Sequence, residues 1–171
     1  MVRQGVQRTG GVGRRHAARL AAVQALYQME LAGEAAPLVI EEFVAHRLDR
    51  EIEGVSIGPA DQEMFAGIVR GASARREEID AAISASLDKE REIGRLEAVI
   101  RACLRAAGHE MLERIDVPAK VIINEYVDVA KTFFTGNEPR FANGVLDRMA
   151  KQLRPAEMAT GSGDDAPPPV R

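Results

Sequence analysis

Two carboxylates in this sequence, Glu125 and Asp128, lie three residues apart, a spacing that places two side chains on one face of a helix. Such a pair could act as general acid and base if its surroundings shifted the pKa values. A solvated helix face explains the pair as well. The other candidates for proton transfer are three histidines in different helical segments, His16, His46 and His109. We therefore expect no catalytic residues and a protein that is not an enzyme.

The sequence lacks the residues and motifs that a disulfide, a metal site or a bound cofactor would need. The single cysteine, Cys103, cannot form an internal disulfide, and no Cys/His spacing of the metal-binding kind exists. The sequence contains no Walker-type phosphate loop and no nucleophile elbow. We expect no cofactor and no metal. Cys103 is predicted to be a small buried hydrophobe, and His109 a neutral, hydrogen-bonded group in or near the core.

The strongest chemical signal is an uneven distribution of charge. Residues 1–29 contain five arginines and no acidic residue. That segment carries +5, and because the whole chain carries −3, the remainder carries −8. A basic end on an acidic body indicates an anionic partner such as nucleic acid, although a solvated basic tail would have the same composition.

Membrane insertion and secretion are not indicated. No apolar run approaches the roughly 18 residues that a membrane span needs, and the polar N-terminus lacks the apolar core of a signal peptide. We expect a cytoplasmic protein with no membrane partner.

The segments that position these residues are predicted to be helices throughout. Apolar residues recur at steps of three and four, and alanine, leucine, glutamate and arginine favour helix. Gly33 is expected to end the first helix. No stretch shows strand-like alternation, and residues 49–60 are predicted to form a loop, so the fold class is all-α. The predicted helices span residues 14–31, 37–48, 59–87, 96–111, 116–133 and 139–153.

Composition divides the chain into four parts. Residues 1–13 are polar and glycine-rich, which is typical of a flexible arm. Residues 155–171 are rich in proline, glycine, serine and aspartate and are predicted to be disordered. The charged stretch DKERE is the expected hinge between an N-terminal helical subdomain, 14–88, and a C-terminal one, 89–154.

The pair Asn143-Gly144 is the strongest two-residue signal for a β-hairpin. The apolar residues around it nevertheless follow one helix face, so we predict a helix. Glycine inside a helix costs about 1 kcal/mol relative to alanine. We expect a close neighbouring helix at Gly144 to offset that cost. Gly67 and Gly71, four residues apart, could allow another close helix contact or a kink.

Three segments together resemble the NusB family of bacterial transcription antitermination factors. They are RRHAARLAAVQALYQME at Arg14–Glu30, LRAAGHEML at Leu104–Leu112, and DVPAKVIINEYVDVAKTFF followed by FANGVLD between Asp116 and Asp147. The middle segment departs from the family pattern at His109, where the family has tyrosine. The resemblance covers roughly residues 14–155 and implies two small helical bundles packed together.

The resemblance implies RNA and protein partners. Proteins of this family bind boxA-like, single-stranded nascent RNA together with a small-subunit ribosomal protein, NusE, and act within an RNA polymerase antitermination complex, notably on ribosomal RNA operons. The implied RNA-binding residues are Arg14, Arg15 and Arg19 in the first helix, and Asn137, Arg140 and Phe141 at the loop before the last helix.

Several assignments stay open at this stage. Phe141 could stack on a base or belong to the buried stripe, and Asn137 could contact a base edge or form a turn. Tyr27 could lie in the core or face the protein partner. A homodimer is also compatible with the sequence.

Two other functions remain as alternatives. NusB-like domains also precede methyltransferase domains that modify ribosomal RNA, but we expect no such domain here because room and a Gly-rich cofactor loop are lacking. A helical bundle that binds proteins without RNA is the second.

Overall fold

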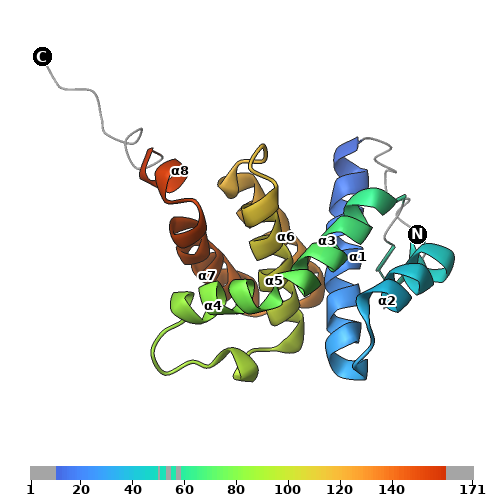
Figure 1. Ribbon diagram of the computed structural model, residues 1–171, viewed down its shortest axis with the longest axis horizontal. Helices are drawn as coiled ribbons and strands as arrows, with labels where there is room; N and C mark the ends of the chain where they lie inside the picture. The colour runs from blue at the N-terminus through green and yellow to red at the C-terminus, as the bar shows by residue number, and fades with distance from the viewer. Residues whose placement is uncertain (1–10, 50, 53–54, 57–58, 161–171) are drawn as a thin grey trace, which may run out of the picture.

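The prediction of an all-α fold is confirmed. The computed structural model describes residues 11–49, 51–52, 55–56 and 59–160. Two very short strands pair antiparallel within the predicted loop, with Glu51 opposite Ser56. The elements are α1 (Gly11–Ala32), α2 (Ala36–Glu42), the π-helical turn η1 (Phe43–Arg47), β1 (Glu51–Ile52), β2 (Val55–Ser56), α3 (Gln62–Ala74), α4 (Arg76–Ser86), the 3-10 turn η2 (Ile93–Arg95), α5 (Ala98–Glu113), α6 (Ala119–Phe133), α7 (Glu138–Leu153) and α8 (Pro155–Thr160) (Figure 1).

The ends of the first helices follow local chemistry. Gly33 adopts a left-handed backbone with φ of 68°, and its N–H donates to the carbonyl of Met29 at 2.9 Å, so the predicted stop is confirmed. Asp61 caps α3 by accepting the N–H of Met64 at 3.0 Å. Helix α1 begins at Gly11, three residues before the predicted start. Residues 11–13 of the predicted flexible arm therefore belong to α1. The remainder of the predicted arm, 1–10, lies outside the described residues.

The predicted long helix from residue 59 to 87 is two helices. The break is at Arg75, whose φ and ψ of −105° and 21° leave the helical range. Two residues earlier, the Ser73 hydroxyl donates to the carbonyl of Val69 at 2.7 Å, a bond that favours bending. After the break, α4 packs against α5 and α7 rather than α1. We therefore propose that the boundary between the bundles lies near Arg75 rather than at the predicted hinge near Lys89.

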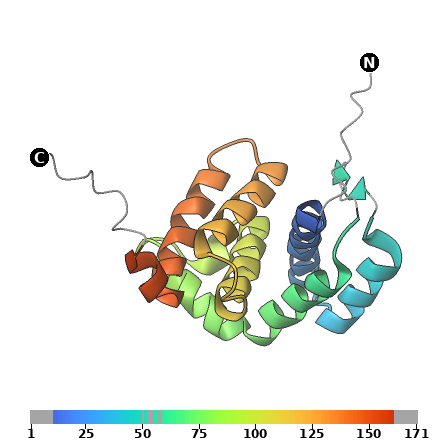
Figure 2. The same cartoon turned by 90° about the horizontal axis from the view of Figure 1, so that it is seen from above.

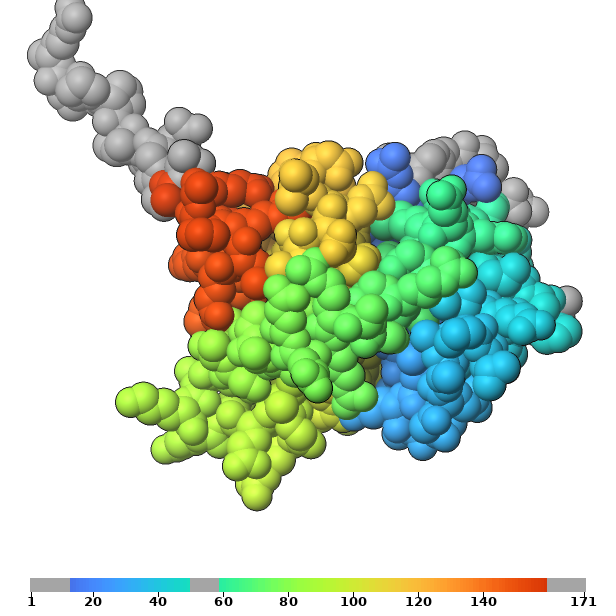
Figure 3. All heavy atoms as spheres, viewed as in Figure 1, coloured from blue at the N-terminus to red at the C-terminus, as the bar shows by residue number. Residues whose placement is uncertain are grey.

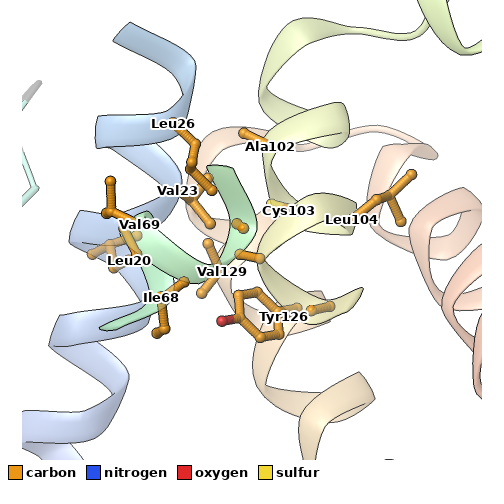
Figure 4. Packing of buried hydrophobic residues seen from close by; sticks show 14 of the residues in the cluster. Leu20, Val23, Leu26, Ile68, Val69, Ala102, Cys103, Leu104, Tyr126 and Val129 are labelled. Atoms are coloured by element: carbon orange, nitrogen blue, oxygen red, sulfur yellow. The ribbon is translucent and has the colours of Figure 1, made fainter. Parts of the chain in front are cut away.

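The two bundles share α5. In Figure 2, α1, α2 and α3 lie on the right and α6 and α7 on the left, and α5 packs against helices of both groups. Every residue of α5 from 100 to 111 is buried. Figure 4 shows Cys103 and Leu104 pointing to different sides of α5. Burial raises the pKa of the Cys103 thiol to about 12, as expected for an inert core cysteine.

Close helix packing occurs at glycines other than Gly144. A β-carbon at Gly71 would lie 2.0 Å from the His109 ring. One at Gly108 would lie 2.7 Å from Ile79. At Gly144 the nearest atom would be on Arg148, 3.9 Å away. The helix around Asn143-Gly144 is confirmed, but the expected close neighbour at Gly144 is wrong.

His109 is buried as predicted, yet it is not fully hydrogen-bonded. Its Nδ1 is buried and has no hydrogen-bond partner, because the ring edge lies against the backbone at Gly71. Burial is the main cause that lowers the pKa of His109 below its ordinary value. The residue is therefore neutral in the core, where its ring fills the space that Gly71 leaves open.

The predicted disordered tail begins later than residue 155. Residues 155–160 form α8, and the buried guanidinium of Arg154 explains why. Its Nε donates to the carbonyl of Met111 at 2.9 Å, and its Nη1 reaches Glu157 of α8 at 3.1 Å. Glu157 also accepts the N–H of Ala119, at the start of α6, at 2.7 Å. The rest of the predicted tail, 161–171, lies outside the described residues.

Replacing Glu157 with alanine should lower the free energy of unfolding by about 0.5–2 kcal/mol, the range for losing a helix-capping acceptor. The backbone hydrogen bond from Ala119 is the main cause that lowers the pKa of Glu157. The stabilisation is therefore present above the ordinary pKa of 4.5 and is lost as the pH falls through the lowered value. Urea denaturation at pH 7 and at acid pH measures the loss of stability and its dependence on pH. Truncation after Thr160 is the control, because it keeps Glu157; an equal loss in that variant would contradict the assignment.

Within the described residues, no helix is both long enough and apolar enough to cross a membrane.

Candidate nucleic-acid interface

Arg14 and Arg15 lie exposed in the first turns of α1. They line a surface hollow together with Asp49, Gln62 and the segment 59–61 that leads into α3. This segment is held against the start of α1, because the Asp61 N–H donates to the carbonyl of Arg14 at 3.1 Å. The helix start thus presents two guanidinium groups beside a concave surface. Such an arrangement can bind phosphate oxygens.

Arg19 lies in the core, contrary to its predicted contact with RNA. Its side chain is only 6% exposed, and its Nε and Nη2 donate to the two carboxylate oxygens of Glu110, each at 2.9 Å. The Tyr126 hydroxyl donates to the same carboxylate. Burial alone would lower the pKa of Arg19, but the hydrogen bond and charge of Glu110 outweigh it and raise that pKa. Arg19 therefore stays charged and joins α1 to α5 and α6.

Glu125 links the start of α1 to α6. Its Oε2 lies 3.0 Å from Nδ1 of His16 and 3.6 Å from Nη1 of Arg19. Asp128 instead lies 3.7 Å from the ammonium of Lys131. The two carboxylates thus serve separate ion pairs and do not converge on a site. Among the described residues, no group of three or more His, Cys, Asp or Glu side chains could hold a metal ion.

The turn between α6 and α7, together with the first turn of α7, carries the second predicted group. Asn137 and Arg140 are exposed, and the Asn137 side chain forms no capping hydrogen bond at the start of α7. Phe141 is half-buried and packs partly against the core. The guanidinium carbon of Arg91 lies over its ring, 4.6 Å from the centroid. Part of Phe141 therefore packs on the core, as the buried-stripe interpretation predicts, and Arg91 lies over its ring. Stacking of Phe141 on a base stays a prediction.

Tyr27 is half-buried on α1 and packs against the core. The geometry is compatible with a core role and with a contact to a protein partner, so the partner assignment stays a prediction.

Sequence patterns did not predict two sets of side-chain contacts that the structure shows between distant segments. Arg91, in the charged connection between α4 and α5, reaches the ring of Phe141. Arg101 and Arg105, on α5, form ion pairs with Glu30 on α1, and Arg105 also pairs with Asp80 at 2.8 Å. Helical periodicity places residues on a face but does not name a partner in a distant segment.

A model of the NusB family matches residues 16–151. The chain belongs to the NusB family. It is 48% identical over 140 residues to a protein of Sinorhizobium fredii named transcription antitermination protein NusB, an alignment that covers 82% of this chain and 88% of that one. A protein of the same name from Caulobacter vibrioides is also 48% identical over 140 residues, with 82% and 94% covered.

Solved structures of the NusB family have the same arrangement of helices. NusB of T. maritima is 33% identical, with a TM-score of 0.69, and the match covers 85% of this chain and 96% of that one. A structure of the antitermination factors NusB and NusE in complex with double-stranded RNA contains a chain that is 26% identical. Its TM-score is also 0.69, with 84% of this chain and 99% of that one covered. The expected arrangement of two packed helical bundles is confirmed.

Proposed function

We propose that this protein is a transcription antitermination factor that binds boxA-like nascent RNA together with a NusE-type ribosomal protein, and that it promotes read-through by RNA polymerase, notably in ribosomal RNA operons. The observation that carries the proposal is the 48% identity, over 140 residues, to proteins named transcription antitermination protein NusB. The proposed activity is binding and assembly, with no catalytic step.

The exposed start of α1 supports RNA binding. Arg14 and Arg15 are free to contact phosphates, and neither takes part in an ion pair among the described residues. They belong to the segment of residues 1–29 that carries +5. Phosphate contacts supply affinity and orientation, whereas unpaired bases supply sequence information.

The turn between α6 and α7 supports base recognition. Asn137 can hydrogen-bond a base edge, because its amide is exposed and unused as a cap. Arg140 adds a charge beside it, and Phe141 offers part of an aromatic ring. In Figure 2 this turn lies apart from the start of α1, so one RNA strand that contacts both groups must cross the surface between them. We propose single-stranded RNA as the ligand, because its bases can leave the stack.

The acidic remainder of the chain, at −8, suits a basic ribosomal protein as the second partner. Tyr27 is our proposed contact for it. If RNA touches both proteins, each partner should strengthen binding of the other by the same factor. A homodimer is the competing assembly, and the protein partner would then have to displace the second copy.

Replacing both Arg14 and Arg15 with alanine should weaken binding to a labelled, boxA-like single-stranded RNA and flatten its salt dependence. Each neutralised phosphate contributes a slope of about −0.7 in a log–log plot, so the slope should change by about one to two units. Fluorescence anisotropy at several salt concentrations, with and without the ribosomal-protein partner, measures both effects. Unlabelled double-stranded RNA as competitor separates recognition of single strands from that of duplexes.

The matched control is the double variant Arg70→Ala and Arg76→Ala, which removes two exposed charges from α3 and α4. Its slope should change much less than that of the α1 variant. Equal changes in the two variants would mean that only overall charge matters. If the wild type binds the protein partner but no RNA, the protein is a protein-interaction bundle instead.

A further inference from the structure

The connection between α4 and α5 reaches the predicted RNA-binding turn. This connection projects at the lower left of Figure 3, where it stands out from the body of the molecule. Arg91 lies in it, and its guanidinium carbon is 4.6 Å from the centroid of the Phe141 ring. A segment about 50 positions away in the sequence thus covers the aromatic ring at the start of α7.

Simple charge pairing does not account for this position of Arg91. Its sequence neighbours Glu90 and Glu92 are both acidic, but Glu92 lies 3.7 Å from Arg95 instead. In the part of the chain that the structure describes, Arg91 takes part in no ion pair, and its guanidinium lies over the Phe141 ring. A cation over an aromatic face is held by the ring quadrupole, and a planar guanidinium can also stack on it.

A guanidinium that lies over an aromatic ring has a second face that a ligand can contact. Arg91 is exposed, so part of its side chain is open to solvent while its guanidinium lies over the Phe141 ring. Arginine planes and aromatic rings are the two protein surfaces on which unpaired RNA bases stack. The flanking acids make the connection a poor site for phosphate alone. This combination favours a nucleobase over a phosphate as the group that Arg91 receives.

We propose that Arg91 is an RNA-binding residue and that its guanidinium, layered on Phe141, forms a platform for an unpaired base. The inference rests on the proposed function and extends the RNA-binding surface from the turn between α6 and α7 to the connection between α4 and α5. Phe141 supports one face of the guanidinium. The exposed Asn137 and Arg140 lie beside it, just before and within the first turn of α7, and can hold the base edge and the adjoining phosphate.

The test compares Arg91→Ala with Arg95→Ala in binding to a labelled, boxA-like single-stranded RNA. Arg95 is 85% exposed and belongs to the same connection, so its loss removes an equal charge without touching the ring. We expect Arg91→Ala to weaken binding about tenfold, the scale of one stacked base, and Arg95→Ala to change it little. The difference should persist at high salt, because stacking does not depend on counterion release.

Arg91→Lys and a double variant make the test specific. Lysine keeps the charge but lacks the plane, so it should bind nearly as weakly as Arg91→Ala. Combining Arg91→Ala with Phe141→Leu should lose less affinity than the sum of the two single losses, because the pair acts as one unit. Thermal unfolding of each variant shows whether the protein is still folded.

The outcomes separate the inference from the proposed function. Equal losses in Arg91→Ala and Arg95→Ala, or full recovery in Arg91→Lys, would overturn the base platform and leave a role for charge alone. Tighter binding by Arg91→Ala would overturn it too, because Arg91 would then be a cover that RNA must displace. Failure of the wild type to bind RNA at all would remove the proposed function, and this inference with it.

Discussion

Replacing Glu110 with glutamine should lower the free energy of unfolding by about 3–5 kcal/mol, the range for breaking a buried ion pair by removing one partner. Glu110 is fully buried and receives two hydrogen bonds from Arg19. Glutamine keeps the shape but not the charge, so Arg19 would be left in the core with only Glu125, 3.6 Å away, as a counter-charge. Equilibrium unfolding in urea, followed by circular dichroism, measures the change.

The matched control is Glu113→Gln, three residues further along α5. Glu113 is exposed and pairs with Arg75 at the surface, where ion pairs contribute little because water screens them. We expect little change in that variant. A double replacement, Arg19→Met with Glu110→Leu, should recover part of the stability lost in Glu110→Gln, because no uncompensated charge remains. Equal stabilities of Glu110→Gln and Glu113→Gln would contradict the importance of the buried pair.

This pair also bears on RNA binding, although it does not touch RNA. Arg19 lies on the same helix as Arg14 and Arg15, four to five residues further along. The Glu110 carboxylate therefore anchors the helix whose exposed first turns are proposed to contact phosphates. A weakened anchor should lower RNA affinity through the position of α1 and leave the salt slope nearly unchanged, since the two exposed arginines remain.

Replacing Gly71 with alanine should destabilise the protein by about 1–3 kcal/mol, the usual result of overpacking a core. The new β-carbon would lie 2.0 Å from the His109 ring, closer than atoms can approach, so α3, α5 or the ring must move. The ring has little freedom, because His109 is buried between the helices. Thermal and urea unfolding of the variant measure the loss.

Gly67 provides a matched control one turn earlier on α3. A β-carbon there would meet no atom within 4 Å, and the position is exposed. Gly67→Ala should therefore stabilise the protein by up to about 1 kcal/mol through helix propensity alone. Both variants gain the same propensity, so their difference isolates the contact with His109. If Gly71→Ala were as stable as Gly67→Ala, the two helices would not be packed as closely as described.

Much of the local structure could be predicted from the sequence, because it depends on neighbours in the chain. The helical segments follow from apolar residues three and four apart. The end of α1 at Gly33 follows from the backbone freedom of glycine, and the cap at Asp61 from a side chain that reaches the N–H three residues on. The family was also visible, because its motifs are local strings of residues.

The predicted RNA-binding residues were separated only by the tertiary structure. Arg15 and Arg19 are four residues apart on one helix and have the same chemistry. One is exposed, and the other donates to Glu110, 91 positions away in the sequence. No local pattern distinguishes them, since burial depends on which helix packs against that face. The contact of Arg91 with Phe141 depends in the same way on where the connection between α4 and α5 folds back.

The same distinction holds for glycines and for the chain end. Helix propensity marks Gly71 and Gly144 as equally unfavourable inside helices. Of the two, only Gly71 has a neighbouring side chain, His109, in the space that a β-carbon would occupy. Proline and small polar residues after Arg154 predict disorder. Residues 155–160 nevertheless form α8, whose Glu157 accepts a hydrogen bond from the N–H of Ala119 at the start of α6. The sequence by itself determined the all-α fold class, the end of α1 at Gly33, the family and the basic end of the chain. Only the tertiary structure decided which charges are buried, which glycines are packed and where α8 binds, because these depend on contacts between segments that are distant in sequence.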